Sequence, residues 1–213
     1  MTTPSTSALS LRERNKLRLR RKIVASTVTL VARRGLDKVT ADEIAEHAQV
    51  GRATFFRYFD SKEAAVVVGF YEERLQALVA MLDKAPPKLG ALDAVIWTFA
   101  QLSTNMDTQG RMIRLGVELQ ASSAVLRAKA AEYHSRYEQA IANAVAGRCR
   151  LSGPDDLRPR LIAAAVLAVT HTSIEHWSTN KSQLDLPALV RAGLRQLKSG
   201  FCDSRSLRRT TAA

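Results

Sequence analysis

Residues 39–63 read VTADEIAEHAQVGRATFFRYFDSKE, and this stretch decides the fold of the N-terminal part of the chain. Thr40 and Glu43 have the spacing of a capping box, so a short helix is expected from there to about residue 48. A second short helix is expected over residues 52–59, after a brief turn. Two short helices joined by a three- or four-residue turn are typical of a helix-turn-helix.

A recognition helix needs a rigid support, and four apolar side chains in this stretch are predicted to form one: Ile44, Val50, Phe55 and Phe59. It also needs short or polar residues at its leading end, so that the backbone can approach the major groove of DNA. The sequence meets that requirement with Gly51, Arg52, Ala53 and Thr54.

Several residues of the stretch carry chemistry that suits DNA. Arg52 can donate two hydrogen bonds to O6 and N7 of a guanine, and Thr54 can reach a base or a phosphate. Thr40 and Lys62 lie near helix N-termini, where exposed N–H groups help to bind phosphates. The alternative for Thr40 is a helix cap without a phosphate contact, and the phosphate contact is preferred.

The segments on either side are also predicted to be helical. A helix is expected from Ser10 to about Arg34, ended by Gly35 in a left-handed conformation. Seven of the twelve residues in 11–22 are Lys or Arg, which indicates an anionic partner or a solvated basic face. A longer helix is expected after residue 60 or 61, reaching residue 82 or 83.

The rest of the chain predicts more helices and no strand. Pro86 and Pro87 interrupt the helical pattern, because a residue before proline is pushed out of helical space. Apolar periodicity then indicates an all-α fold with helices at about 89–105, 109–120, 123–147, 156–179 and 185–199. The second-to-last of these is rich in alanine and apolar nearly all round, so it must be covered on several sides.

Charge and cysteine content narrow the class of protein. The 213 residues include 32 Lys and Arg against 20 Asp and Glu, a net charge of +12 that attracts polyanions such as nucleic acid. Cys149 and Cys202 are too few for a disulfide framework, and no apolar stretch is long enough to span a bilayer. We therefore expect a cytoplasmic protein without membrane contact.

Residues 23–63 resemble the DNA-binding domain of the TetR/AcrR-type family of transcriptional repressors. The resemblance is carried by residues 23–35 and 44–48 and most strongly by the block from Thr54 to Glu63. It implies a three-helix DNA-binding domain, a larger C-terminal helical domain and a homodimer that binds an operator in double-stranded DNA. It also implies a small-molecule effector and no cofactor or metal. The implied DNA-binding residues are Thr40, Gly51, Arg52, Ala53, Thr54, Phe56, Arg57, Tyr58 and Lys62.

Three residues depart from the family pattern. Gln49 replaces the usual turn glycine, so a residue with a side chain has to adopt a positive φ. Gly51 replaces a Ser or Thr that would cap the recognition helix, and Phe56 replaces a tyrosine whose hydroxyl binds phosphate. We hypothesise that the basic N-terminal helix and tail compensate for these losses.

The family pattern assigns a function to each part of the chain. The expected ranges are a disordered tail at 1–9, the DNA-binding domain at 10–60, a linking helix at 61–84, the ligand-binding and dimerisation domain at 85–200, and a flexible basic tail at 201–213. Candidate lining residues of the ligand cavity are Trp97, Phe99, Met106, Met112, Leu115, Leu119, Tyr133, Tyr137 and Trp177, each of which also suits a plain core.

Residues 118–126 and 155–160, together with Trp177, resemble a subgroup that includes the mycofactocin-system regulator. That resemblance implies an acyl-thioester or another long apolar effector. Arg111 and Arg114 could bind an anionic ligand, although the preferred interpretation is a solvated helix face.

Two alternative functions are an enzyme and a DNA-binding protein without effector release. An enzyme is disfavoured, because no Glu has a His three residues later and no Gly-rich phosphate loop or nucleophile elbow is present. A constitutive DNA-binding protein, or an activator without effector release, remains open; the sizeable helical domain argues against mere DNA coating.

Overall fold

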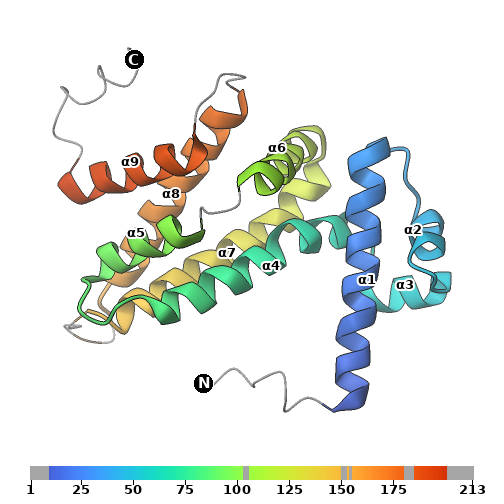
Figure 1. Ribbon diagram of the computed structural model, residues 1–213, viewed down its shortest axis with the longest axis horizontal. Helices are drawn as coiled ribbons and strands as arrows, with labels where there is room; N and C mark the ends of the chain where they lie inside the picture. The colour runs from blue at the N-terminus through green and yellow to red at the C-terminus, as the bar shows by residue number, and fades with distance from the viewer. Residues whose placement is uncertain (1–9, 103–105, 150–152, 154, 180–184, 201–213) are drawn as a thin grey trace. The chain divides into compact units, whose positions relative to one another are not determined.

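The computed structural model describes residues 10–102, 106–149, 153, 155–179 and 185–200, with the side chains of 106–109 excepted. Within these residues the chain forms nine α-helices and no strand (Figure 1). The expected tails at 1–9 and 201–213 lie outside the described residues. The helices are α1 (Leu11–Arg34), α2 (Ala41–His47), α3 (Arg52–Tyr58), α4 (Lys62–Lys84), α5 (Ala91–Leu102), α6 (Met106–Ser122), α7 (Ala124–Ala146), α8 (Arg158–Thr179) and α9 (Leu186–Ser199).

The chain divides into two compact units, of which the first comprises residues 10–73 and 118–130. Its core contains the side chains predicted to support the recognition helix: Ile44 and Phe55 are fully buried, Phe59 is 4% exposed and Val50 is half-buried. Gly69 lets α4 approach α1 closely, since a Cβ added there would lie 2.4 Å from Cγ2 of Val28. Small and β-branched residues thus set the spacing of these two helices.

The predicted helix boundaries of this unit are confirmed by its capping interactions. At the start of α1, Ser10 and Glu13 form a complete capping box. At its end, Gly35 adopts φ +81° and its N–H donates to the Val31 carbonyl, 2.9 Å away. The ψ of 157° at Gly35 lies outside the left-handed helical region that was expected, but glycine adopts this backbone conformation without steric cost, so α1 still stops there.

The second unit comprises residues 74–117 and 131–200, apart from the gaps given above. In it, α9 packs against both α8 and α5. Gly193 permits the α8–α9 contact, because a Cβ there would lie 2.6 Å from Cγ1 of Val169. The core of this unit is a cluster of twelve buried residues: Leu78, Leu82, Val95, Ile141, Ala142, Val145, Ala163, Val166, Trp177, Leu186, Val190 and Leu194.

The unit boundaries fall inside α4, α6 and α7, so these three helices each contribute residues to both units. The segment 118–130 lies in the middle of the range expected for ligand binding, yet by its contacts it belongs with the helix-turn-helix. The functional ranges proposed from the sequence remain a prediction. None of the helices in the described part of the chain combines the length and the apolar character needed to cross a membrane.

Candidate nucleic-acid interface and effector groove

The turn between α2 and α3 is closed by backbone hydrogen bonds. Gln49 adopts φ +52°, which confirms the positive φ expected at this position. Its N–H donates to the Glu46 carbonyl at 2.8 Å, and the Val50 N–H donates to the Ala45 carbonyl at 2.9 Å. These two bonds form a Schellman motif, which ends α2 and turns the chain into α3.

Thr40 caps α2 in a complete capping box. Its hydroxyl oxygen accepts from the Glu43 N–H at 3.2 Å, while the Glu43 carboxylate accepts from the Thr40 N–H at 2.8 Å. Arg34 adds a second donor to Glu43, and these hydrogen bonds hold the pKa of that carboxyl below its ordinary value, the Thr40 backbone bond most strongly. The cap is therefore formed; the phosphate contact of the Thr40 hydroxyl stays a prediction.

Arg52 begins α3, and its guanidinium binds the carboxylate of Asp42 on α2. The same guanidinium lies 5.1 Å from the centre of the Phe56 ring, which is 42% exposed. Both Arg52 and Asp42 have exposed side chains. No sequence pattern predicts the pairing of Arg52 with Asp42, because the two residues are ten apart and lie on different helices.

The remaining predicted DNA contacts follow along α3. Gly51 is the N-cap residue and makes no side-chain cap, as expected for its lack of a hydroxyl. Ala53 and Arg57 are exposed, whereas Thr54 and Tyr58 are half-buried. The leading end of α3 is therefore small and open to solvent, which suits a close approach to DNA.

Lys62 has a structural role in addition to the predicted phosphate contact. Its ammonium group donates to the backbone carbonyls of Leu36 and Val39, each at 2.9 Å. These bonds tie the first turn of α4 to the loop that precedes α2. An ammonium carries three donors, so one remains for a phosphate.

The segment 118–130 binds the helix-turn-helix unit through two polar contacts. Lys129 donates to Asp60 at 3.0 Å and holds the pKa of that carboxyl below its ordinary value, and Gln120 donates to the Tyr71 hydroxyl at 2.8 Å. Neither contact is predictable from a sequence pattern, because the partners are 69 and 49 residues apart.

The aromatic and apolar residues predicted to line a cavity are mostly part of the core. Trp177 is 8% exposed and belongs to the core cluster of the second unit, and Phe99 and Tyr137 pack against that cluster. Leu119 is buried in the first unit, and Tyr133 is 7% exposed. Of the remaining predicted residues, Trp97, Met112 and Leu115 are half-buried. The side chain of Met106 lies outside the described residues.

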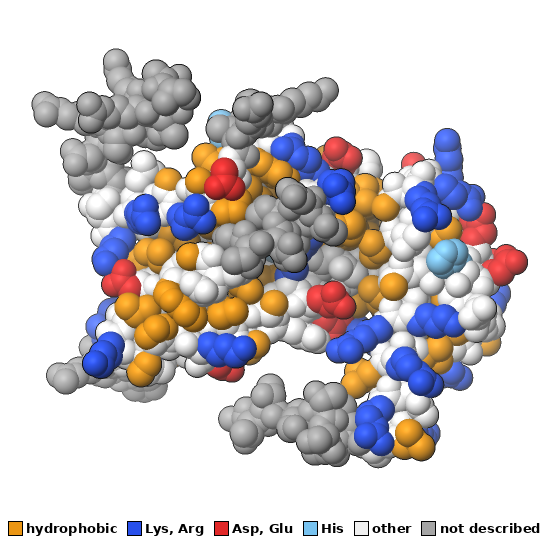
Figure 2. Space-filling model, in the orientation of Figure 1, with side chains coloured by type: hydrophobic (Ala, Val, Ile, Leu, Met, Phe, Trp, Pro, Cys, Tyr) orange, Lys and Arg blue, Asp and Glu red, His pale blue; other side chains and the backbone are white. Residues whose placement is uncertain are grey.

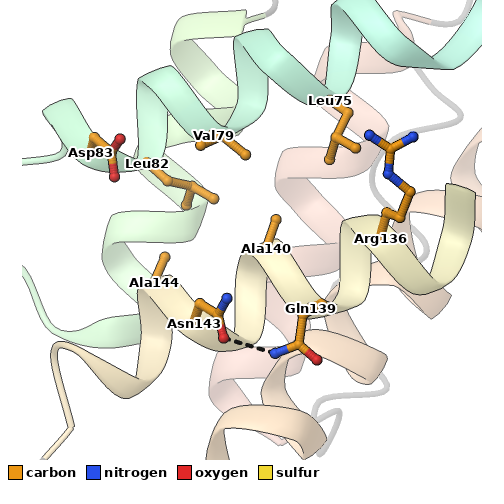
Figure 3. A pocket seen from close by; sticks show the side chains of 9 residues that line it. All are labelled: Leu75, Val79, Leu82, Asp83, Arg136, Gln139, Ala140, Asn143 and Ala144. Carbon is orange, nitrogen blue, oxygen red and sulfur yellow. Dashed lines mark hydrogen bonds between the residues drawn. The ribbon is translucent and has the colours of Figure 1, made fainter. Parts of the chain in front are cut away.

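A groove of about 490 Å³ lies elsewhere on the second unit, between α4 and α7 (Figure 3). Its apolar wall consists of Leu75, Val79 and Leu82 from α4, facing two alanines of α7. Polar groups border it: Gln139 donates to Asn143 at 2.7 Å. The full set of lining residues is Leu75, Val79, Leu82, Asp83, Arg136, Gln139, Ala140, Asn143 and Ala144, none of which was among the nine predicted for the cavity.

Arg114 closes the end of α8 and does not lie on a solvated face. Its guanidinium lies 3.6 Å from the centre of the Trp177 ring and donates to the carbonyls of Trp177 and Ser178, each at 3.1 Å. These carbonyls belong to the last turn of α8, which lacks intrahelical donors. Arg111 is exposed.

Among the residues that the structure describes, histidine and carboxylate side chains do not assemble into a metal centre. The rings of His134 and His171 lie 6.0 Å apart, edge to face, and His171 pairs with Glu175 at 3.5 Å. Within the described residues, no group of three His, Cys, Asp or Glu side chains is arranged to hold a metal ion.

Comparison with known proteins matches both parts of the chain to regulators. Residues 23–66 match the family described as bacterial regulatory proteins, tetR family, and residues 87–202 match the MftR C-terminal domain. The regulator TcmR of Streptomyces glaucescens is 30% identical over 199 residues, which cover 88% of this chain and 86% of TcmR. The mycofactocin biosynthesis regulator MftR of Mycobacterium tuberculosis is 27% identical over 157 residues, covering 73% of this chain and 77% of MftR.

Solved structures share the fold. The FadR repressor of Thermus thermophilus, crystallised with lauroyl-CoA, has a TM-score of 0.63 at 21% identity and covers 91% of this chain and 98% of its own. FadR of Bacillus subtilis, crystallised with stearoyl-CoA, has a TM-score of 0.60 at 22% identity, with 84% and 98% covered. Relatives with assigned roles are thus transcriptional regulators and not enzymes.

Proposed function

Since this chain belongs to the TetR family of transcriptional regulators, with a C-terminal domain of the MftR type, we propose that it is a cytoplasmic homodimeric repressor released from its operator by an acyl-thioester. The observation that carries the proposal is the helix-turn-helix with its open, small leading end, in which Gly51 and Ala53 are exposed on either side of Arg52. Such an end can enter a major groove.

An exposed apolar stripe on α8 supports the dimer. Leu157, just before the helix, is 59% exposed and Leu161 is 62% exposed, and Ala164 and Ala168 continue the same face at spacings of three and four residues. Monomeric proteins rarely leave such a row uncovered. With the close approach of α8 and α9 at Gly193, a second copy can cover the stripe in a four-helix bundle.

The groove between α4 and α7 is the site we propose for the effector. Its volume is within the usual range for small-molecule sites, and its wall of leucine, valine and alanine suits an acyl chain. Arg136 borders it and offers a cation to the polar end of such a ligand; its guanidinium lies 4.6 Å from the Tyr133 ring. The bound lauroyl-CoA and stearoyl-CoA of the two FadR proteins support this ligand class.

Leu82 connects the groove with the residues predicted from the sequence. It lines the groove and also belongs to the core cluster against which Phe99 and Tyr137 pack. A long acyl chain can therefore extend from the groove into the region of these aromatic side chains. In this proposal Phe99 and Tyr137 form the deep part of the site, and a lining role for the other predicted residues stays a prediction.

Release requires that the ligand bind one conformation of the protein better than the other. The helices that line the groove, α4 and α7, each contribute residues to the helix-turn-helix unit. Within that unit, the ion pair between Lys129 and Asp60 binds α7 to the segment between α3 and α4. A ligand that spreads α4 from α7 would thereby change the position of the recognition helix. The two recognition helices of a dimer would then no longer fit successive major grooves.

The test is fluorescence anisotropy of a labelled duplex from upstream of the protein's own gene, compared with a scrambled duplex. We expect the protein to bind the upstream duplex about 10³-fold more tightly than the scrambled duplex at physiological salt. Lauroyl-CoA should release the protein from the upstream duplex, and coenzyme A alone should not. Ala140→Trp, which fills the groove, should remove the response to lauroyl-CoA and leave DNA binding intact. The matched control is Ala80→Trp, an exposed α4 alanine outside the groove.

Equal binding to both duplexes would contradict the specific repressor and favour a constitutive DNA-binding protein. Specific binding that no acyl-thioester relieves would contradict only the effector. Size-exclusion chromatography with light scattering gives the oligomeric state, and a monomer at micromolar concentration would contradict the dimer.

A further inference from the structure

The first three turns of α1 stand apart from the rest of the first unit. Every side chain from Leu11 to Arg18 is exposed, including Leu11 at 67% and Leu17 at 42%, and the first fully buried residue of the helix is Ile23. Figure 1 shows these turns extending past α2 and α3. We call residues 11–22 the cationic arm.

The arm carries a concentrated positive charge. Its twelve residues include seven Lys and Arg and one acidic residue, Glu13. In the described part of the chain, only Arg20 among the seven has a carboxylate within ion-pair distance. Lys and Arg side chains recur along α1 as far as its N-terminal end (Figure 2).

This charge is unfavourable for an isolated helix. Cations four residues apart, such as Arg12 and Lys16 or Arg14 and Arg18, repel one another on the helix surface. Residues 11–18 are all exposed, so burial of their side chains does not offset this repulsion. An anionic partner along the arm would remove the repulsion.

The direction of the arm is fixed at its base. Arg20 donates to Glu72 on α4 at 2.5 Å, and its guanidinium lies 5.5 Å from the centre of the Phe59 ring. Lys22 donates to the side-chain oxygen of Gln49 in the helix-turn-helix turn at 2.8 Å. These contacts, made within one compact unit, couple the orientation of the arm to that of α3.

We propose that the cationic arm binds the phosphodiester backbone of duplex DNA beside the base pairs that α3 reads. The inference rests on the proposed DNA-binding function and adds a second contact region to it. At 1.5 Å per residue the arm is about 18 Å long, enough to follow roughly five base pairs of backbone. Its Lys and Arg side chains point to all sides of the helix, so some of them can bind backbone phosphates, and such contacts do not depend on the base sequence.

The arrangement favours DNA over a membrane surface. A helix that binds a bilayer needs a continuous apolar face opposite its charges. Leu11 and Leu17 are six residues apart and therefore point to different sides of the helix. The arm thus offers charge complementarity to a polyanion but no face to insert into lipid.

The test compares two triple variants of the full-length protein with equal charge loss. The arm variant is Arg12→Gln, Arg14→Gln and Arg18→Gln; the control is Lys84→Gln, Lys88→Gln and Arg111→Gln, all exposed in the second unit. Each is titrated onto a labelled 40-bp duplex of mixed sequence, a length chosen as roughly two helical turns per half-site, between about 50 and 200 mM KCl. Circular dichroism verifies that helix content is retained, since the substitutions only relieve repulsion.

We expect the slope of log K against log salt to become shallower by about 2 to 3 per protomer in the arm variant and to stay unchanged in the control. An unchanged slope in the arm variant, with DNA still bound, would overturn the arm proposal alone. If the wild-type protein does not bind the duplex at all, the proposed DNA-binding function is overturned as well. Co-sedimentation with phosphatidylserine vesicles that depends on the arm, together with an unchanged DNA slope, would assign the arm to lipid and overturn the DNA proposal.

Discussion

The Arg52 guanidinium is bound to the Asp42 carboxylate across the turn of the helix-turn-helix. The residue expected to read a base is therefore held by an anion that DNA phosphates would repel. Both side chains are more than half exposed, so the pair is weak and opens at little cost. Asp42 thus orients Arg52 in the free protein and competes with DNA for it.

Asp42→Asn should strengthen DNA binding several-fold, because it removes the competing charge while keeping a hydrogen-bond acceptor. Arg52→Ala should weaken it by about 1–3 kcal/mol and relax base preference if Arg52 reads guanine. Anisotropy on the preferred duplex measures both. In a double-mutant cycle, the gain from Asp42→Asn should shrink when Arg52 is absent. A gain of equal size in both backgrounds would mean that Asp42 acts only through its general repulsion of phosphates.

Arg114→Lys should destabilise the second unit by about 1–3 kcal/mol. A lysine cannot stack its head flat on Trp177 while donating to two carbonyls, so partly buried acceptors at the end of α8 lose a partner. Urea unfolding followed by tryptophan fluorescence measures the loss. Arg111→Lys, three residues away and exposed, is the matched control and should change little. Equal stability of the two variants would show that the stacking is incidental.

Local signals explain why the helix-turn-helix was predictable. Thr40 and Glu43 determine the start of α2 by hydrogen bonds within four residues, and Gly35 determines the end of α1 through its own φ. The positive φ of Gln49 followed from its position in the family pattern. Each of these features depends on neighbours in the chain, which is where sequence patterns are informative.

Two kinds of feature could not be predicted from the sequence. Some are contacts between residues far apart in the chain, and others are side chains that suit a core and a cavity equally well. Arg114 reaches Trp177 across 63 residues, and Lys129 reaches Asp60 across 69. A large aromatic side chain serves a core and a cavity equally well, so composition alone did not separate Trp177 from a pocket lining. The groove went unpredicted because leucine and alanine on a helix are ordinary core residues until the neighbouring helix is placed.

Gly69→Ala should lower the stability of the first unit by about 1–3 kcal/mol, although alanine is the better helix former by up to about 1 kcal/mol. The new methyl group would lie 2.4 Å from Cγ2 of Val28, and a β-branched side chain in a helix has little rotamer freedom with which to move away. Differential scanning calorimetry measures the change. Gly110→Ala is the control, because its Cβ would meet the Trp177 ring at an ordinary 3.4 Å; it should be neutral or stabilising. A stabilising Gly69→Ala would mean that α1 and α4 can separate without cost.

Acidification should destabilise the second unit through His134 on α7. Partial burial of its ring, and then the neighbouring His171, lower the pKa of His134 below its ordinary value of 6.5, and because the side chain is still exposed the effect on stability is small. In the unfolded chain the ring regains that ordinary pKa, so the unfolded state binds more protons between the folded pKa and about 6.5. The free energy of unfolding is therefore unaffected above that range and falls as the pH drops through it. Glu43 and Asp60, whose pKa values are lowered, lose their contributions to the free energy of unfolding only below about pH 4.5, so they act in a separate pH range.

Chemical denaturation at a series of pH values measures the loss of unfolding free energy on acidification. This loss should be smaller in His134→Gln than in the wild type, and intermediate in His171→Gln, which removes the neighbouring histidine but keeps His134 itself. An identical pH dependence in all three proteins would show that this histidine pair does not govern stability near neutral pH.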